Sequence, residues 1–242
     1  MNEPKPTHLD LFSGIGGFSL AFEAEGFETI GFSEIDPYAS AVLRKHWPHV
    51  PNYGDVRNAI GGGYCDVITG GFPCQPFSAA GLHKRTLDDR HLWPSMLDVI
   101  KGRRPAWVLG ENVPGILGVD FCDMLTDLEK EGYLTQTFIV PACAIGALHL
   151  RNRVWIIAHS ESLGHVSHSF HKGSDAQIHL RQPCQFSELL ADKDLWYEPE
   201  PGNKRSANGP AQTLDEMRLH AIGNSIVPQV AQVFAKAIRQ LI

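Results

Sequence analysis

The stretch that decides the fold reads Asp10-Leu11-Phe12-Ser13-Gly14-Ile15-Gly16-Gly17 and lies between two periodic segments. An apolar run that begins at His8 leads into it, and the amphipathic stretch Phe18–Glu25 follows it. Glycines at such a junction let the backbone turn tightly and approach a ligand closely. The stretch therefore predicts a strand, a tight turn and a helix, with the turn as a candidate ligand-binding loop.

The alternation of apolar and amphipathic segments continues to residue 160. The predicted strands are His8–Phe12, Thr29–Ser33, Asp66–Gly70, Ala106–Glu111, Thr135–Val140 and Val154–His159. The predicted helices are Phe18–Glu25, Pro37–His46, Trp93–Ile100 and Phe121–Glu131. This rhythm predicts a doubly wound α/β fold with a mostly parallel sheet, whose functional loops lie at the carboxyl ends of the strands. The rhythm is lost over 161–220, and a helical face returns at Ile226–Ile242.

The composition is that of an ordinary globular protein, with 43% hydrophobic and 20% charged residues. No apolar run is long enough to span a membrane and the N-terminus lacks a secretory core, so we expect a cytoplasmic protein with no membrane partner. The five cysteines have no regular spacing, which favours reduced thiols. The histidines at 165, 168 and 171 lack a fitting Cys or carboxylate pattern, so we expect no metal site. The net charge of -6 gives no global sign of nucleic-acid binding.

Three features near the first strands indicate a nucleoside cofactor. Gly14, Gly16 and Gly17 depart from the dinucleotide-binding spacing, because Gly16 and Gly17 are adjacent. Glu34 ends the second predicted strand, where a carboxylate accepts hydrogen bonds from both ribose hydroxyls. Asp55, near the next strand end, offers an acceptor for an exocyclic amine such as that of adenine. A nucleoside without a pyrophosphate fits all three features, and S-adenosyl-L-methionine is the obvious candidate.

Cys74 lies on a polar loop at the end of the predicted strand Asp66–Gly70, between Pro73 and Gln75. A thiol at this place is presented rather than buried, and a thiolate is a strong nucleophile when nearby cations lower its pKa. The sequence therefore predicts a nucleophilic cysteine.

An acid and two arginines follow further along the chain. Glu111 ends the next predicted strand, and a carboxyl group there could take up a proton in a water-excluded pocket. Arg151 and Arg153 precede the strand Val154–His159. We expect their side chains to point to opposite sides, one toward the active site and the other toward a phosphate or a loop.

Together these motifs resemble the C5-cytosine-specific DNA methyltransferase family. The matching motifs, in the family's order, are Asp10–Gly17, Glu34, Asp55, Pro73-Cys74-Gln75, Glu111-Asn112-Val113, Arg151-x-Arg153 and Gly223-Asn224-Ser225. They cover roughly residues 7–160 and 220–242. Jointly the motifs are very specific, although each alone is not.

The resemblance implies a Rossmann-like, S-adenosyl-L-methionine-dependent enzyme that methylates C5 of a cytosine flipped out of duplex DNA. It implies that Cys74 attacks C6, that Glu111 bonds N3, and that Arg153 contacts O2 while Arg151 assists. The cofactor residues it implies, together with those derived above, are Phe12, Gly14, Gly16, Gly17, Glu34, Ile35, Asp55, Pro73 and Asn224. The expected DNA contacts are Gln75, Ser78, Lys84, Arg85 and Arg90, in a basic stretch suited to phosphates.

The expected organisation is a catalytic and cofactor-binding core (1–160), a reduced target-recognition region (161–220) and a C-terminal helix that returns to the core (221–242). We expect a monomer that acts on double-stranded DNA, in a restriction-modification system or a mobile element. Because the recognition region is short, a catalytically weak relative that only binds cofactor or DNA stays open. A tRNA cytosine-C5 methyltransferase, which shares these motifs, stays open as well.

Overall fold

The computed structural model describes residues 4–73, 92–147, 151–160, 221 and 225–242. Its centre is a six-stranded sheet with the order β2-β1-β3-β4-β6-β5. The strands are β1 (Thr7–Leu11), β2 (Glu28–Ser33), β3 (Val67–Gly70), β4 (Trp107–Asn112), β5 (Tyr133–Pro141) and β6 (Asn152–Ser160). The recognition region expected over 161–220 lies outside the described residues.

Four neighbouring strands, β2, β1, β3 and β4, run parallel. β6 is antiparallel to both of its neighbours, β4 and β5, so it is the one reversed strand of this sheet. The parallel register places the ends of β1, β3 and β4 at one edge, because Leu11 pairs with Gly70 and Gly70 with Gly110. The expectation of a doubly wound, mostly parallel sheet is confirmed.

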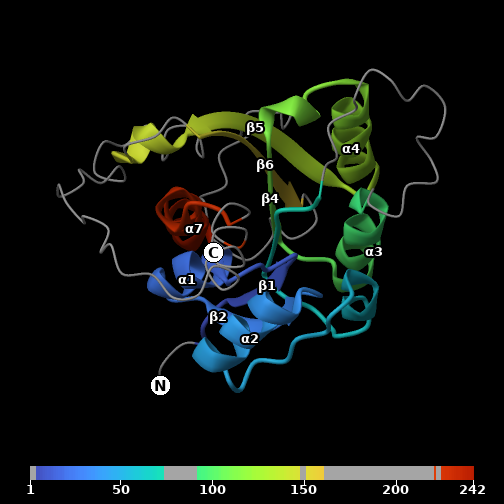
Figure 1. The fold of residues 1–242 in the computed structure, drawn as a ribbon. Helices are drawn as coiled ribbons and strands as arrows, with labels where there is room; N and C mark the ends of the chain where they lie inside the picture. Colours follow the sequence, from blue (N-terminus) through green and yellow to red (C-terminus); the bar gives the residue numbers. More distant parts are fainter. Residues whose placement is uncertain (1–3, 74–91, 148–150, 161–220, 222–224) are drawn as a thin grey trace, which may run out of the picture.

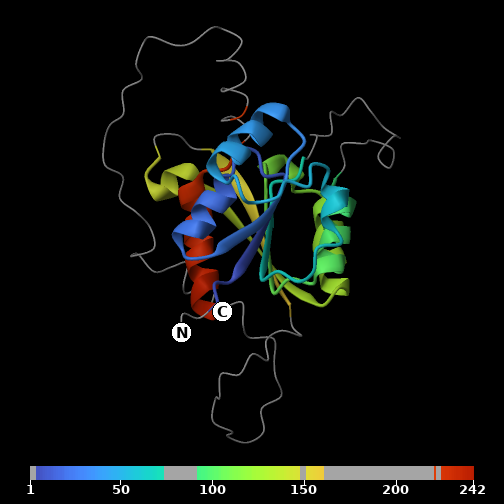
Figure 2. The same ribbon diagram turned by 90° about the horizontal axis from the view of Figure 1, so that it is seen from below.

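Helices cover both faces of the sheet, and Figure 2 shows the three layers edge-on. The helices of the described chain are α1 (Gly17–Ala24), α2 (Pro37–His46), α3 (Trp93–Arg103), α4 (Val119–Lys130) and α7 (Pro228–Leu241). α1 and α7 pack against each other on one face, although most of the chain separates them in sequence (Figure 1). α3 and α4 cover the other face.

Each face of the sheet has its own hydrophobic core. On the α1/α7 side, Phe234 is fully buried and stacks on Trp155, with ring centroids 5.0 Å apart. On the α3/α4 side, Met96 and Ile100 are fully buried against Ile68. Burial of such apolar side chains is the main force that holds helices on a sheet.

Every predicted strand and helix is present within a few residues of its expected bounds. Among the described residues, three short 3₁₀ helices were not predicted: η1 (Val56–Ala59), η2 (Pro114–Ile116) and η3 (Ala142–Ile145). Such segments are too short to show a hydrophobic period. None of the helices in the described part of the chain combines the length and the apolar character that crossing a bilayer requires.

Candidate active site and cofactor pocket

The glycine-rich turn between β1 and α1 has an unusual backbone. Phe12, Gly14 and Gly16 all have positive φ angles, of 53°, 54° and 86°. Phe12 is not a glycine, so its conformation is strained, and such strain gathers at functional sites. Hydrogen bonds hold the turn: the Ser13 hydroxyl donates to the Asp10 carbonyl (2.6 Å), and the Ser13 N–H donates to the Ser33 carbonyl (3.1 Å).

Two glycines of this turn are required by close packing. A Cβ added at Gly16 would lie 2.6 Å from the Trp47 ring, and one added at Gly17 would lie 2.8 Å from Cγ1 of Ile226. Gly17 thus lets the segment before α7 approach the start of α1. The turn and the segment before α7 are therefore in direct van der Waals contact.

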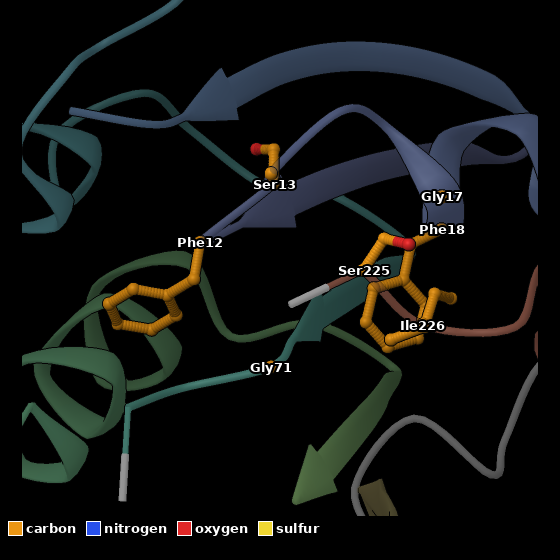
Figure 3. A pocket seen from close by; sticks show the side chains of 8 residues that line it. Phe12, Ser13, Gly17, Phe18, Gly71, Ser225 and Ile226 are labelled. Atoms are coloured by element: carbon orange, nitrogen blue, oxygen red, sulfur yellow. The ribbon is translucent and has the colours of Figure 1, made fainter. Parts of the chain in front are cut away.

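A pocket opens between this turn, the end of β3 and the segment before α7 (Figure 3). Its lining residues are Phe12, Ser13, Gly14, Gly17, Phe18, Gly71, Ser225 and Ile226. The Phe12 ring lies on one side of the pocket, and Phe18 and Ile226 lie on the other. Three of the predicted cofactor residues, Phe12, Gly14 and Gly17, therefore line one cavity.

Glu34 is fixed directly beside the turn. One oxygen of its carboxylate accepts the Gly14 N–H (2.7 Å), and the other accepts the Asp36 N–H (2.7 Å). A carboxylate oxygen has a second lone pair, so both oxygens of Glu34 can still accept from a diol. The next side chain, Ile35, is 73% exposed.

Asp55 caps the helix η1 and pairs with an arginine. Its carboxylate accepts the backbone N–H of Arg57 (2.9 Å) and two guanidinium N–H groups of the same residue (2.8 and 2.5 Å). The hydrogen bonds from Arg57 lower the pKa of Asp55 to about 2, so the carboxylate is ionised at neutral pH. An ionised carboxylate is an acceptor only, so it can accept a hydrogen bond from an exocyclic amine.

Glu111 lies at the end of β4, next to β3 as the sequence predicted. Its side chain is buried and forms an ion pair with Arg153, whose Nε lies 2.8 Å from Oε1. Burial raises the pKa of Glu111, while the charges of Arg153 and Arg151 act in the opposite direction. Desolvation is the largest of these effects, so Glu111 takes up a proton more readily than an exposed glutamate does.

Arg151 and Arg153 lie on the same side of their segment. The charges of both arginines lower the pKa of Glu111. Burial lowers the pKa of Arg151, and the charge of Arg153 acts in the same direction. The expectation that they point to opposite sides was wrong, because residues two apart on an extended segment share a face. Their contacts do differ: Arg153 pairs with Glu111, whereas Nη2 of Arg151 donates to the Ser225 carbonyl (2.7 Å).

The segment toward the predicted nucleophile leaves β3 beside this acid. A Cβ added at Gly71 would lie 3.4 Å from Oε2 of Glu111. The chain continues through the buried Phe72 to the exposed Pro73. The other predicted site residues lie outside the described residues: Cys74, Gln75, Ser78, Lys84, Arg85, Arg90 and Asn224.

Several residues of this region were not predicted as site residues. Ser13, Phe18, Gly71, Ser225 and Ile226 line the pocket. Asn112 belongs to the Glu111-Asn112-Val113 motif, but no role was predicted for it. Its buried amide donates to the Phe72 carbonyl (2.9 Å). A polar residue that ends an otherwise apolar strand is a signal that could have identified Asn112.

In the described part of the chain no three His, Cys, Asp or Glu side chains are grouped so that they could hold a metal ion.

Comparison with known proteins identifies the family. Residues 7–204 match the model of the C-5 cytosine-specific DNA methylases. The chain belongs to this family. The resemblance inferred from the motifs is thereby confirmed, and S-adenosyl-L-methionine is the methyl donor of the family, as predicted.

Curated relatives of this chain include bacterial type II methyltransferases. M.HgiCII of Herpetosiphon aurantiacus is 33% identical over 180 residues, which cover 71% of this chain and 41% of the relative. M.NgoMIV of Neisseria gonorrhoeae is 34% identical over 193 residues, which cover 77% of this chain and 60% of the relative. The chain thus matches about half the length of these relatives.

A solved structure supports the fold. The methyltransferase EhMeth of Entamoeba histolytica superposes with a TM-score of 0.63 and 17% identity, over 99% of this chain and 100% of the other. At this identity the likeness concerns the fold alone.

Proposed function

We propose that this chain is a DNA (cytosine-5-)-methyltransferase that transfers a methyl group from S-adenosyl-L-methionine to C5 of a flipped-out cytosine in duplex DNA. One observation carries the proposal: Gly71 lines the cofactor pocket and also lies against the carboxyl group of Glu111. The pocket and the acid are therefore in contact, at the point where the chain leaves β3 toward Cys74.

The residues around the pocket fit the cofactor. Phe12, Phe18 and Ile226 offer apolar contacts, and Glu34 offers a carboxylate beside the turn for ribose hydroxyls. Asp55 and the exposed Ile35 are proposed to contact the adenine, with Gly16, Pro73 and Asn224 completing the site. When bound, S-adenosyl-L-methionine supplies an electrophilic methyl group.

The proposed chemistry assigns one task to each polar group. The Cys74 thiolate forms a bond to C6, and the electron pair displaced from the C5–C6 bond moves into the ring. Glu111, whose pKa is raised by burial, donates a hydrogen bond to N3 and stabilises this charge. C5 then takes the methyl group, and loss of the C5 proton expels Cys74 and restores the ring.

The two arginines have separate parts in this proposal. Arg153 forms an ion pair with Glu111 and is proposed to contact the cytosine O2. Arg151 donates a hydrogen bond to the carbonyl of Ser225, which lines the pocket. Gln75, Ser78, Lys84, Arg85 and Arg90 are proposed to contact the DNA, with Lys and Arg binding its phosphates.

The family description favours DNA as the substrate, since the matching model is that of a DNA methylase. The type II methyltransferase relatives favour a restriction-modification system. Action as a monomer in the cytoplasm, with residues 161–220 choosing the target and 1–160 and 221–242 forming the catalytic unit, belongs to the same proposal.

Labelled S-adenosyl-L-methionine tests the proposal when it is incubated with the protein and either duplex DNA or tRNA. We expect label in DNA that disappears with Cys74→Ala. Label in tRNA alone would show an RNA methyltransferase instead. Transfer to neither, with the cofactor still bound, would indicate a relative that has lost catalysis. Bisulfite sequencing of the methylated DNA then identifies the target sequence.

A further inference from the structure

The buried amide of Asn112 joins the two segments that carry the proposed chemistry. Asn112 follows Glu111 at the end of β4 and is 4% exposed. Its Nδ2 donates to the carbonyl of Phe72, two residues before Cys74 (2.9 Å). Its Oδ1 accepts the N–H of Val113 (2.9 Å). Both ends of the amide are therefore used.

This hydrogen bond lies where the ladder between the two strands has ended. The register of β3 with β4 stops at the pair Gly70 and Gly110. Pro73, the next residue after Phe72, has no N–H and cannot donate to a neighbouring strand. The Asn112 amide thus holds the chain at the last carbonyl before this proline.

The side chain of Phe72 fixes the same point from the opposite direction. It is 4% exposed and its ring packs on Trp93 at the start of α3, with centroids 5.4 Å apart. A buried ring and a buried amide together leave the backbone of Phe72 little freedom. The direction in which the chain leaves toward Cys74 is set here.

We propose that Asn112 is a positioning residue, which fixes the segment leading to Cys74 relative to Glu111. This inference rests on the proposed function. Attack on a flipped base needs the nucleophile and the acid in register, and a misplacement of about 1 Å lowers a rate by roughly 100-fold. Asn112 acts through the Phe72 carbonyl and does not itself touch the substrate.

Asn112→Asp tests this role with almost no change in size. The introduced carboxylate can still accept the Val113 N–H, but it has no proton to donate to the Phe72 carbonyl. In a single-turnover assay with duplex DNA we expect the methyl-transfer rate to fall by roughly 100-fold. The affinity for S-adenosyl-L-methionine should change by no more than about twofold, because Asn112 does not line its pocket.

The pH dependence separates positioning from a general loss of structure. As the pH falls, the introduced carboxyl group becomes protonated and gains an O–H donor for the Phe72 carbonyl. Burial raises the pKa of a carboxyl group, so we expect the rate of Asn112→Asp, relative to wild type at the same pH, to rise as the pH falls from about 8.5 to about 5.5. Asn112→Ala, which removes both hydrogen bonds and adds no charge, should be slow at every pH.

Asn58→Asp is the matched control. Nδ2 of Asn58 also donates to a backbone carbonyl, that of Tyr53 (3.1 Å), but on the surface of the molecule. The same chemical change there should leave the transfer rate at the wild-type value.

Three outcomes would overturn the inference while the wild-type chain still methylates DNA. They are a wild-type rate in both Asn112 variants, a parallel loss of cofactor affinity and rate, and an Asn112→Asp defect that is the same at every pH. If Asn112→Asp fails to fold, Asn112→Ala is the test. A fall in its transfer rate with unchanged cofactor affinity supports the inference, and an equal fall in both overturns it. Absence of transfer by the wild-type chain would overturn the proposed function, and the inference with it.

Discussion

At the scale of single residues, burial and neighbouring charges change the pKa values of a few ionisable groups. Glu111 and Arg153 form a buried pair in which desolvation favours the neutral acid and the guanidinium favours the carboxylate. A buried pair of this kind is weak evidence for added stability, since both groups lose hydration. In the proposed mechanism, the pair lets a proton be held or released beside the pocket, where the cytosine ring would react.

Glu111→Ala should therefore affect turnover more than binding. We expect the turnover number to fall by roughly 100- to 1000-fold, because the lost hydrogen bond acts mainly in the transition state. The affinity for S-adenosyl-L-methionine, measured by calorimetry, should stay near the wild-type value. Glu131→Ala, which removes a surface partner of Lys101 and Arg104, is the control and should keep full turnover. Loss of cofactor affinity with turnover unchanged would refute the role of Glu111.

Beneath the glycine-rich turn, His8 and Asp10 are fully buried and linked through the Thr69 hydroxyl (2.8 and 3.3 Å). Burial raises the pKa of Asp10 to about 7 and lowers that of His8 to about 3. The raised pKa of Asp10 makes the free energy of unfolding fall as the pH rises from 3.8 to about 7. The lowered pKa of His8 makes the free energy of unfolding rise as the pH rises from about 3 to 6.5. The two effects oppose each other over most of this range.

Single substitutions should reveal each half of this balance. In Asp10→Asn, the His8 effect remains, so stability should rise with pH up to about 6.5, by at most about 1.4 kcal/mol per pH unit. In His8→Asn, stability should fall toward pH 7. Urea unfolding of wild type and both variants at a series of pH values measures the slopes. Identical slopes in all three proteins would contradict the balance.

At the scale of elements, the pocket depends on how closely α1 approaches the segment before α7. Gly17→Ala would place a methyl group 2.8 Å from Cγ1 of Ile226 and push the two pocket walls apart. Inserting a methyl group into a well-packed site typically costs about 1–3 kcal/mol. Since about 1.4 kcal/mol corresponds to a tenfold change in Kd, we expect the cofactor affinity to fall about tenfold or more. Gly26→Ala is the control: its φ of 87° makes alanine strained, but no atom crowds it. It should lower stability by about 1 kcal/mol and leave the affinity unchanged, whereas equal affinities in both variants would contradict the packing argument.

The elements themselves were largely predictable. Apolar runs and amphipathic stretches carry their own period, so β1 to β6 and the helices of the described chain appear close to their expected bounds. Strand direction is not encoded in such a period, and the reversal of β6 could not be derived from it. The motif residues Gly14 and Glu34 were both assigned to a cofactor, but their hydrogen bond depends on two strand ends meeting. The contact of Asn112 with Phe72 depends likewise on the β3–β4 register.

At the scale of the whole molecule, the last helix completes the site. α7 packs on α1, and the two residues before it that line the pocket, Ser225 and Ile226, are held by Arg151 and Gly17. A pocket built from segments that lie far apart in the sequence exists only when these segments are docked on each other. Docking of α7 and binding of the cofactor should therefore stabilise each other.

Phe234→Ala tests this coupling. The ring of Phe234 is fully buried in α7 against Trp155, so its removal should lower the free energy of unfolding by about 3–5 kcal/mol. Because a ligand that binds only the folded state stabilises it by mass action, saturating S-adenosyl-L-methionine should raise the melting temperature of the variant and restore part of the loss. Leu241→Ala, at an exposed position of the same helix, should change stability by less than about 0.5 kcal/mol. Scanning calorimetry of wild type, Phe234→Ala and Leu241→Ala, with and without cofactor, measures these changes. If the cofactor stabilises a folded chain truncated after residue 221 as strongly as it stabilises wild type, α7 has no part in the pocket.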